Sequence, residues 1–323
     1  MRTIFIILCA FALALPARTE AQTTADKLRL IVVVGAAGEE EYGSNFVHSA
    51  ELWAQAGKTG GADVTVIGVE PTNATTDFER LKQALAAEPK ESVEELWLVL
   101  LGHGTFDGKV ANFNLRGPDF SADDLASWLQ PFKRPLAVID CSSCSAPFLP
   151  KLSAPGRVIV TATRSGSEEN YTRFGQYISE AMVDPASDLD KDGQVSLLEA
   201  FLAASRRVAE FYKDEGRLAT EHALLDDNGD GLGTPADWFR GIRAVKRARN
   251  GAPLDGTRAN QFYLVRSAAE QKIPPALRER RNELELAVEK LRDQKAKMDE
   301  DEYYRQLEPM MVELAKISAQ GTQ

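Results

Sequence analysis

The stretch Leu96–Leu101 (LWLVLL) is uninterrupted apolar sequence, and Gly102-His103-Gly104 follows it at once. Four similar apolar runs lie at Leu28–Val34, Val64–Val69, Leu136–Ile139 and Val158–Thr161. A strand with one wet face alternates polar and apolar residues, so continuous apolar runs indicate parallel strands that are buried on both faces. Amphipathic stretches typical of helices separate these runs, at Phe46–Ala56, Asp77–Ala87 and Ser121–Leu129. The alternation predicts an α/β fold, a three-layer sandwich whose mostly parallel sheet lies between helices.

The composition is that of an ordinary globular protein, with 323 residues of which 44% are hydrophobic and 27% are charged. The length suggests about two domains. The formal net charge is −10 and no tract of basic residues is present, so we expect no nucleic-acid partner. Three histidines and three cysteines make a structural zinc site improbable, whereas the acidic balance suits a cation with oxygen ligands.

Residues 1–21 have the pattern of a secretory signal peptide. Arg2 provides the positive start, Ile4–Leu15 the apolar core, and Thr19-Glu20-Ala21 an end typical of a cleavage site. No later run is long and apolar enough for a transmembrane helix, so we expect a secreted or periplasmic mature chain with no membrane span. Cleavage removes Cys9 and leaves Cys141 and Cys144 in an oxidising compartment.

The second half of the chain has a different character. We expect a calcium-binding segment at 184–250, which holds two acidic loops and an amphipathic helix at Leu197–Tyr212. The segment 258–267, which includes QFYLV at 261–265, is a candidate for one more strand. The charged segment 275–318 carries apolar stripes at helical spacing and predicts a helical hairpin, an element for packing, partner binding or self-association.

The first acidic loop, Asp188–Glu199, matches the EF-hand calcium loop. Its ligand positions are occupied by Asp188, Asp190, Asp192, Gln194, Ser196 and Glu199. Gly193 stands where the loop needs a sharp turn, Gln194 offers a backbone carbonyl, and Glu199 offers a bidentate carboxylate. Val195 is expected to bridge to a neighbouring loop. The pattern predicts that Ca²⁺ binds here.

The second acidic loop is a weaker copy that resembles the calcium loops of dockerin modules. Its ligand positions are Asp226, Asn228, Asp230, Leu232, Thr234 and Asp237, with Leu232 contributing its backbone carbonyl. Gly231 fits the turn position, but Gly233 replaces the apolar bridge and Asp237 is shorter than the usual glutamate. We expect a second calcium ion here, in a loop that pairs with the first.

His103 and a pair of cysteines follow two of the apolar runs. Asp140-Cys141-Ser142-Ser143-Cys144 comes directly after Leu136–Ile139. If the two strands are parallel neighbours, the imidazole and the thiols meet at the carboxyl edge of the sheet, where sites of such folds lie. A thiol becomes a competent nucleophile when a base or an imidazolium lies beside it.

An apolar strand ending in His-Gly, followed by an apolar strand ending in an acidic residue and Cys, resembles the caspase/legumain clan of cysteine peptidases. The resemblance covers 26–182, and Leu30–Gly35, Tyr42–Ala50 and Val160–Ser165 look like segments of legumains. It implies a caspase-like sandwich and a catalytic His103. It also implies an oxyanion hole made by the backbone N–H of Gly104 and that of the cysteine.

The nucleophile is ambiguous because this chain departs from the legumain pattern of acid-Ala-Cys-x-Ser-Gly. Counting from the acidic residue places Ser142 at the nucleophile position, counting by Cys-x-Ser places Cys141 there, and counting from His103 favours Cys144. We favour Cys141, which is nearest the strand end. The Arg-His pair of the legumain substrate pocket is matched by Val47-His48, so selectivity for asparagine does not carry over.

Three functions fit these residues. The first is a secreted or periplasmic cysteine endopeptidase that acts on a peptide or protein substrate through a His-Cys dyad, with calcium stabilising the accessory segment. The second is a catalytically inactive, calcium-binding relative that presents a peptide groove, with Cys141 and Cys144 joined in a disulfide. The third is thiol–disulfide exchange at the Cys-x-x-Cys pair, which leaves His103 unexplained.

Overall fold

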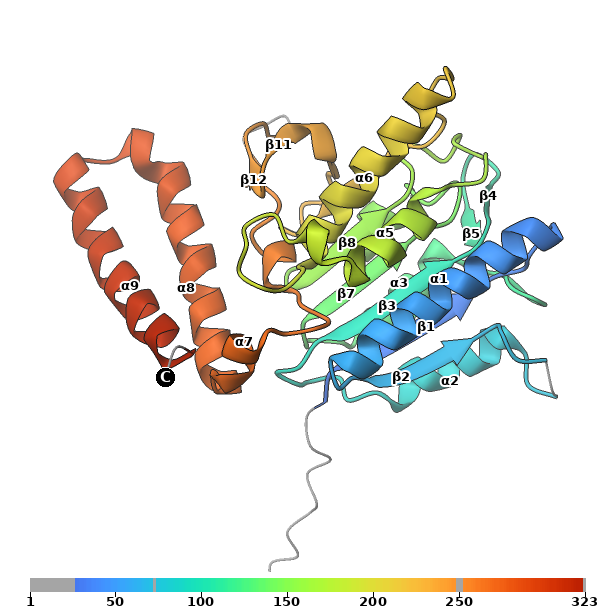
Figure 1. Cartoon of the computed structure of the whole chain (residues 1–323), viewed down its shortest axis with the longest axis horizontal. Helices are drawn as coiled ribbons and strands as arrows, with labels where there is room; N and C mark the ends of the chain where they lie inside the picture. The colour runs from blue at the N-terminus through green and yellow to red at the C-terminus, as the bar shows by residue number, and fades with distance from the viewer. Residues whose placement is uncertain (1–26, 72–73, 248–251, 322–323) are drawn as a thin grey trace, which may run out of the picture.

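A computed structural model describes residues 27–71, 74–247 and 252–321 (Figure 1). Its main sheet has seven strands in the order β10-β9-β8-β7-β3-β1-β2. The strands are β1 (Arg29–Val34), β2 (Asp63–Ile67), β3 (Leu96–Leu101), β7 (Leu136–Asp140), β8 (Arg157–Thr161), β9 (Leu224–Asp226) and β10 (Thr234–Pro235). The first five pair in parallel, which confirms the parallel sheet that the apolar runs predict.

Helices cover both faces of this sheet and make the three-layer sandwich that the sequence predicts (Figure 1). One face packs against α1 (Glu40–Thr59), α5 (Phe174–Val183) and α6 (Leu197–Asp214). The other packs against α2 (Asp77–Ala87), α3 (Ala122–Leu129) and α4 (Phe148–Leu152). Side chains alternate between the two cores, so Val32 joins the first and Ile31 the second.

The chain after His103 forms a small antiparallel sheet beside the main one. Its strands are β4 (Gly104–Phe106), β5 (Ala111–Phe113) and β6 (Phe120–Ser121). Ser121 then caps α3: its hydroxyl accepts the N–H of Asp124, and the Asp124 carboxylate accepts the N–H of Ser121. This reciprocal cap fixes the start of α3 at the residue where the sequence predicts it.

The strands β9 and β10 extend the sheet in an antiparallel sense, and they flank the second acidic loop. The sequence analysis missed them because each is very short. The expected extra strand at 258–267 is wrong: this segment holds a 3₁₀ helix at Ala259–Gln261 and makes one isolated bridge, from Tyr263 to Ser196. Short elements complete this region: η1 (Pro185–Ser187), η2 (Ala236–Trp238), β11 (Phe239–Arg240) and β12 (Arg243–Ala244).

The C-terminal segment forms the expected helical hairpin. After α7 (Ala268–Lys272), α8 (Pro275–Gln294) leads through η5 (Lys295–Lys297) to α9 (Glu300–Gly321), and the two long helices lie side by side (Figure 1). Their shared core is small and is centred on Ile273, Leu284 and Ile317. Within the described residues, no helix combines the length and the apolar character that crossing a bilayer requires.

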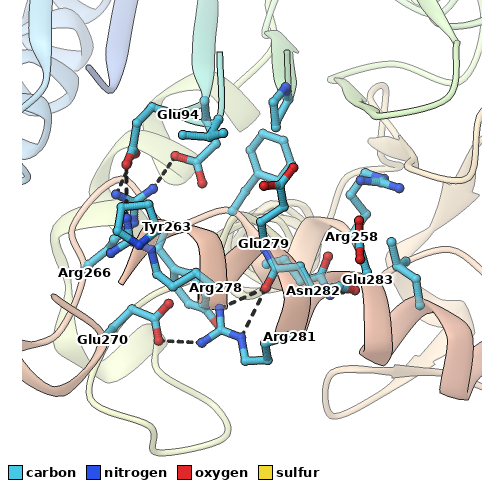
Figure 2. Close-up of a pocket in the computed structure, with 17 residues that line it drawn as sticks. Glu94, Arg258, Tyr263, Arg266, Glu270, Arg278, Glu279, Arg281, Asn282 and Glu283 are labelled. Atoms are coloured by element: carbon cyan, nitrogen blue, oxygen red, sulfur yellow. Dashed lines mark hydrogen bonds and ion pairs between the residues drawn. The ribbon is translucent and has the colours of Figure 1, made fainter. Parts of the chain in front are cut away.

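Ion pairs attach the hairpin and its approach to the sandwich. Arg266 contacts Glu94 at 2.8 Å and Glu95 at 2.6 Å, just before β3 (Figure 2). Arg278 of α8 contacts Glu94 at 3.0 Å. These carboxylates are nearly buried, so removing Arg266 takes the ion-pair partner from Glu95 and destabilises the fold, whereas Glu94 keeps Arg278.

The carboxyl edge of β1 and β2 has no room for a side chain at Gly68. Gly68 has φ +98°, and a Cβ there would lie 1.9 Å from the carbonyl oxygen of Val34. We predict that Gly68→Ala lowers the free energy of unfolding by at least about 3 kcal/mol, because the clash adds to the left-handed penalty. Gly61→Ala is the matched control: Gly61 has φ +75° with nothing within 4 Å of its Cβ, so we expect about 1 kcal/mol. Equal losses in denaturant titrations of the two variants would refute the close approach.

Candidate functional site

The carboxyl ends of β3 and β7 lie side by side, as the candidate site requires. These strands are parallel neighbours, with Leu100 paired to Asp140. His103 follows the first strand, and Cys141 follows the second. The prediction that both segments reach one edge of the sheet is therefore confirmed, although neighbouring strand ends do not decide where the side chains point.

His103 lies in a group of aromatic side chains. Its ring makes edge contacts with Tyr42 and Phe46, at centroid distances of 5.4 Å and 5.2 Å, and Tyr42 stacks on Tyr171 at 4.4 Å. The Nε2 atom of His103 lies 3.2 Å from the carbonyl oxygen of Ala37. A carbonyl only accepts, so Nε2 carries the proton in this contact and Nδ1 is the remaining acceptor of a neutral ring.

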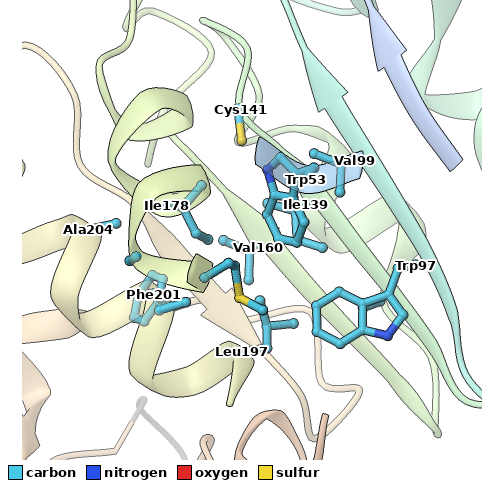
Figure 3. Packing of buried hydrophobic residues seen from close by; sticks show 14 of the residues in the cluster. Trp53, Trp97, Val99, Ile139, Cys141, Val160, Ile178, Leu197, Phe201 and Ala204 are labelled. Carbon is cyan, nitrogen blue, oxygen red and sulfur yellow. The ribbon is translucent and has the colours of Figure 1, made fainter. Parts of the chain in front are cut away.

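Cys141 belongs to the hydrophobic core. Its side chain packs beneath α5, near Gly175, in the cluster that includes Ile139 (Figure 3). Its backbone is held on both sides, because its N–H donates to Leu100 and its carbonyl accepts from the Thr172 hydroxyl. Burial raises the pKa of the Cys141 thiol well above its usual value, and the Asp140 and Glu221 carboxylates raise it further. A thiolate is strongly disfavoured here.

Cys144 is also buried, at the end of a tight turn. Its φ is +56°, and its N–H donates to the carbonyl of Glu168. Burial raises the pKa of the Cys144 thiol to about 11, and the Glu169 and Asp140 carboxylates add to the rise. Cys141 and Cys144 are both free thiols in the structure. Among the described residues, only burial and carboxylates shift the pKa values of these thiols, and no cation activates either one.

The two serines between the cysteines occupy the polar positions of the site. The N–H and the hydroxyl of Ser142 both donate to Asp140 Oδ1, at 3.0 Å and 2.6 Å. The hydroxyl of Ser143 accepts the N–H of Gly104 at 3.1 Å and donates to the carbonyl of Gly104 at 3.2 Å. The N–H that the resemblance assigns to an oxyanion hole is therefore already engaged. Burial raises the pKa of Asp140 to about 7, against the opposing effect of the Ser142 bonds.

The candidate dyad stays a prediction. Across the described residues, no hydrogen bond joins the His103 ring to Cys141, Ser142 or Cys144. His48, the residue at the legumain substrate-pocket position, is exposed on α1.

The sequence analysis missed a second histidine site beside the Cys144 turn. His222 Nδ1 lies 2.6 Å from the carboxylate of Glu168, whose carbonyl holds Cys144. His222 and Glu168 are 54 positions apart, and neither belongs to a motif that would signal the contact. Only the folded chain brings them together.

The first acidic loop brings three of its predicted ligands close together. Asp188, Asp190 and Asp192 each place one carboxylate oxygen within 4.8 Å of the others. Glu199 is fully buried and faces the same loop, because its carboxylate accepts N–H groups from Leu189, Asp190 and Ser196. Burial and the neighbouring carboxylates raise the pKa values of Asp190 and Asp192. This donor set fits Ca²⁺, which takes several carboxylate oxygens.

The second acidic loop fits a cation less well. Asp226 accepts N–H groups from Gly229 and Gly231, and Asp230 accepts from Leu232, as in a turn of this class. Asp237 does not close the loop: its side chain is 73% exposed and contacts Lys246.

Asp255, which the sequence analysis missed, lies against this second loop instead. It accepts the N–H groups of Asp227 and Asn228 and the hydroxyl of Thr234. Burial and the neighbouring Asp227 raise its pKa to about 8.

The two loops do not bridge each other as expected. Ser196 of the first loop pairs instead with Tyr263. Thr234 of the second loop pairs with Leu225, at the edge of the main sheet. Each loop is therefore anchored to a different part of the sandwich.

Comparisons with known proteins give structural likeness only. No protein-family model matches the sequence, and no curated protein matches it either. A crystal structure of caspase-1 from Spodoptera frugiperda is similar with a TM-score of 0.39 and 11% identity, over 62% of this chain and 87% of that one. A structure of the Drosophila initiator caspase Dronc is similar with a TM-score of 0.41 and 12% identity, over 64% of this chain and 81% of that one.

The thiols offer a direct measure of this site. We predict that in the native protein at pH 7.4 neither Cys141 nor Cys144 reacts with a disulfide reagent within minutes, because both are buried and their pKa values are raised. Both thiols should react when guanidinium unfolds the chain. The single variants Cys141→Ser and Cys144→Ser show which of the two thiols gives any labelling that is observed. Fast native labelling at Cys144 that His103→Ala abolishes would contradict the prediction, and an absence of thiols after unfolding without reductant would indicate a disulfide.

Proposed function

We propose that this protein is a calcium-binding, non-hydrolytic scaffold of the caspase-like type, which binds a peptide or protein segment at the carboxyl edge of its sheet. One observation carries the proposal. The Ser143 hydroxyl pairs with the N–H of Gly104, the group that would otherwise stabilise an oxyanion. The proposal also places the mature protein outside the cytoplasm, as its signal-peptide pattern predicts.

Loss of hydrolysis is supported by the bonding of each candidate group. The N–H of Cys141 donates to Leu100, that of Ser142 to Asp140, and that of Cys144 to Glu168. Removing one oxyanion donor from a working enzyme costs about 10²- to 10³-fold in rate. Here all the candidate donors have internal partners, and burial raises the pKa of both thiols.

Binding at this edge is supported by the aromatic residues around His103. Tyr42, His103 and Tyr171 are half-buried, so each ring has a packed face and an accessible part. Arg173 continues the group, with its guanidinium 5.9 Å from the Tyr171 ring and 3.9 Å from the Phe211 ring. Aromatic residues and arginine dominate the energetics of protein recognition. Such a surface suits a peptide better than it suits a small polar substrate.

Calcium completes the proposal as a structural ligand. Asp188, Asp190, Asp192 and Glu199 would hold it, because three of these carboxylates converge and the fourth is buried against the same loop. The ion would neutralise carboxylates that otherwise repel one another at the start of α6. Since α6 packs on α5, the ion would stabilise the layer that covers Cys141.

A peptidyl electrophile tests the loss of hydrolysis. The reagents are peptidyl acyloxymethyl ketones that differ in the residue next to the ketone. We predict that none of them leaves a covalent adduct on the reduced, calcium-loaded protein, as measured by intact-protein mass spectrometry. A peptide selected from a displayed random library should bind and remain intact, with affinity reduced about tenfold or more in Tyr171→Ala, which removes an anchor ring. Tyr304→Ala is the matched control, because it removes a tyrosine that is exposed on α9 of the helical hairpin. An adduct on Cys144 that requires His103 would establish a peptidase instead.

Thermal unfolding tests the cation. At a calcium concentration one hundredfold above the dissociation constant, we predict about 2.7 kcal/mol of added stability relative to the chelated protein. Asp188→Asn with Asp190→Asn should abolish most of this gain, because the first loop has the buried Glu199 carboxylate. Asp226→Asn with Asp230→Asn is the matched control and should retain most of it, since Asp237 leaves the second loop open. The reverse ranking would move the site to the second loop.

A further inference from the structure

A cavity of about 200 Å³ lies beside the Cys144 turn and outside the aromatic group. It is bounded by α6, by the segment 219–223 and by the segment 235–237. Five of its lining residues are alanines, at positions 162, 209, 219, 223 and 236, and Phe174 and Val208 add apolar wall. The alanine side chains leave a partly open space that is slightly larger than a cavity known to hold benzene.

Two polar groups in the lining have unused hydrogen-bonding capacity. The Ser205 hydroxyl oxygen is buried and has no hydrogen-bond partner in the described part of the chain. The His222 ring is oriented by Glu168, whose carboxylate accepts from Nδ1 at 2.6 Å. With its proton on Nδ1, a neutral His222 presents Nε2 as an acceptor. A buried hydroxyl without a partner destabilises the fold by about 1–3 kcal/mol. A ligand that hydrogen-bonds to Ser205 removes this penalty, and part of that free energy adds to its binding.

The third polar residue in the wall is already occupied. Glu221 accepts the N–H groups of Arg173 and Phe174 at the start of α5, and it accepts the Tyr212 hydroxyl as well. It therefore shapes the wall without competing for a ligand. Asp237 also lines the cavity, but its carboxylate is 73% exposed and contacts Lys246. Apart from this exposed carboxylate, the free capacity in the cavity is one hydroxyl and one imidazole acceptor.

We propose that this cavity binds the phenolic ring of a tyrosyl side chain, which rests on the proposed function because the ring would belong to the bound peptide. The ring matches the apolar wall and the volume. The phenol hydroxyl both donates and accepts, so it donates to His222 Nε2 and accepts from Ser205. A phenyl ring satisfies neither group, and an indole N–H only donates. Glu168 joins this cavity to the site, since its carboxylate holds His222 and its carbonyl holds Cys144.

The experiment uses the full chain with ¹³C-labelled alanine methyl groups, which line the cavity and report occupancy by NMR. The probes are N-acetyl-tyrosinamide and N-acetyl-phenylalaninamide. We expect the methyl signals of Ala209, Ala219 and Ala223 to shift with the tyrosyl probe, and its affinity to exceed that of the phenylalanyl probe about tenfold. Ser205→Ala should reduce this preference about fivefold without loss of fold.

Blocking variants separate the cavity from the rest of the surface. Ala209→Trp fills the space from an exposed position of α6 and should abolish the shifts. Glu210→Trp, its neighbour outside the cavity, should leave them intact. Equal affinity for the two probes, or shifts that survive Ala209→Trp, would overturn the proposal. These readouts do not depend on hydrolysis, so a labelled active-site thiol would refute the proposed function while leaving the cavity result to stand alone.

Discussion

The parallel pairing of β3 with β7 is the constraint on which the rest of the structure depends. It brings the His103 and Cys141 segments to one edge, and it buries the strands completely between two helical layers. Because helices cover both faces of the sheet, each side chain that follows β7 points into one of the two cores or toward the carboxyl edge of the sheet. In the Asp140–Cys144 loop, Cys141 enters the core beneath α5 and Ser143 turns to Gly104 at the edge, so the conformation of this loop decides whether chemistry is possible.

Most of the sandwich could be predicted from the sequence because long apolar runs and capped helices are local signals. The bounds of β3, α2 and α3 agree with the predicted ranges, and Ser121 caps α3 as expected. The short strands β9 and β10 could not be predicted, since their pairing partners are set by tertiary contacts. The segment around Tyr263 has strand composition, but apart from its isolated bridge to Ser196 it pairs with no strand of the main sheet.

The candidate site was less predictable because it depends on side-chain direction. Ala137 and Ile139 face the α5 layer, and period-two alternation continues to Cys141, which therefore enters the same core. That signal was available in the sequence, but proximity to the strand end favoured Cys141 as nucleophile. The Glu168–His222 contact and the position of Asp255 had no such signal, because each joins segments that are far apart in the chain.

The attachment of the helical hairpin has a consequence for how the molecule opens. Its contacts with the sandwich are largely ionic, through Arg266, Arg278, Glu94 and Glu95, whereas its apolar core is internal to the hairpin. A unit with its own core and a polar seam opens with a free energy below that of global unfolding. We therefore expect the hairpin to open as a unit of its own, which would expose charged groups and leave the two main cores covered.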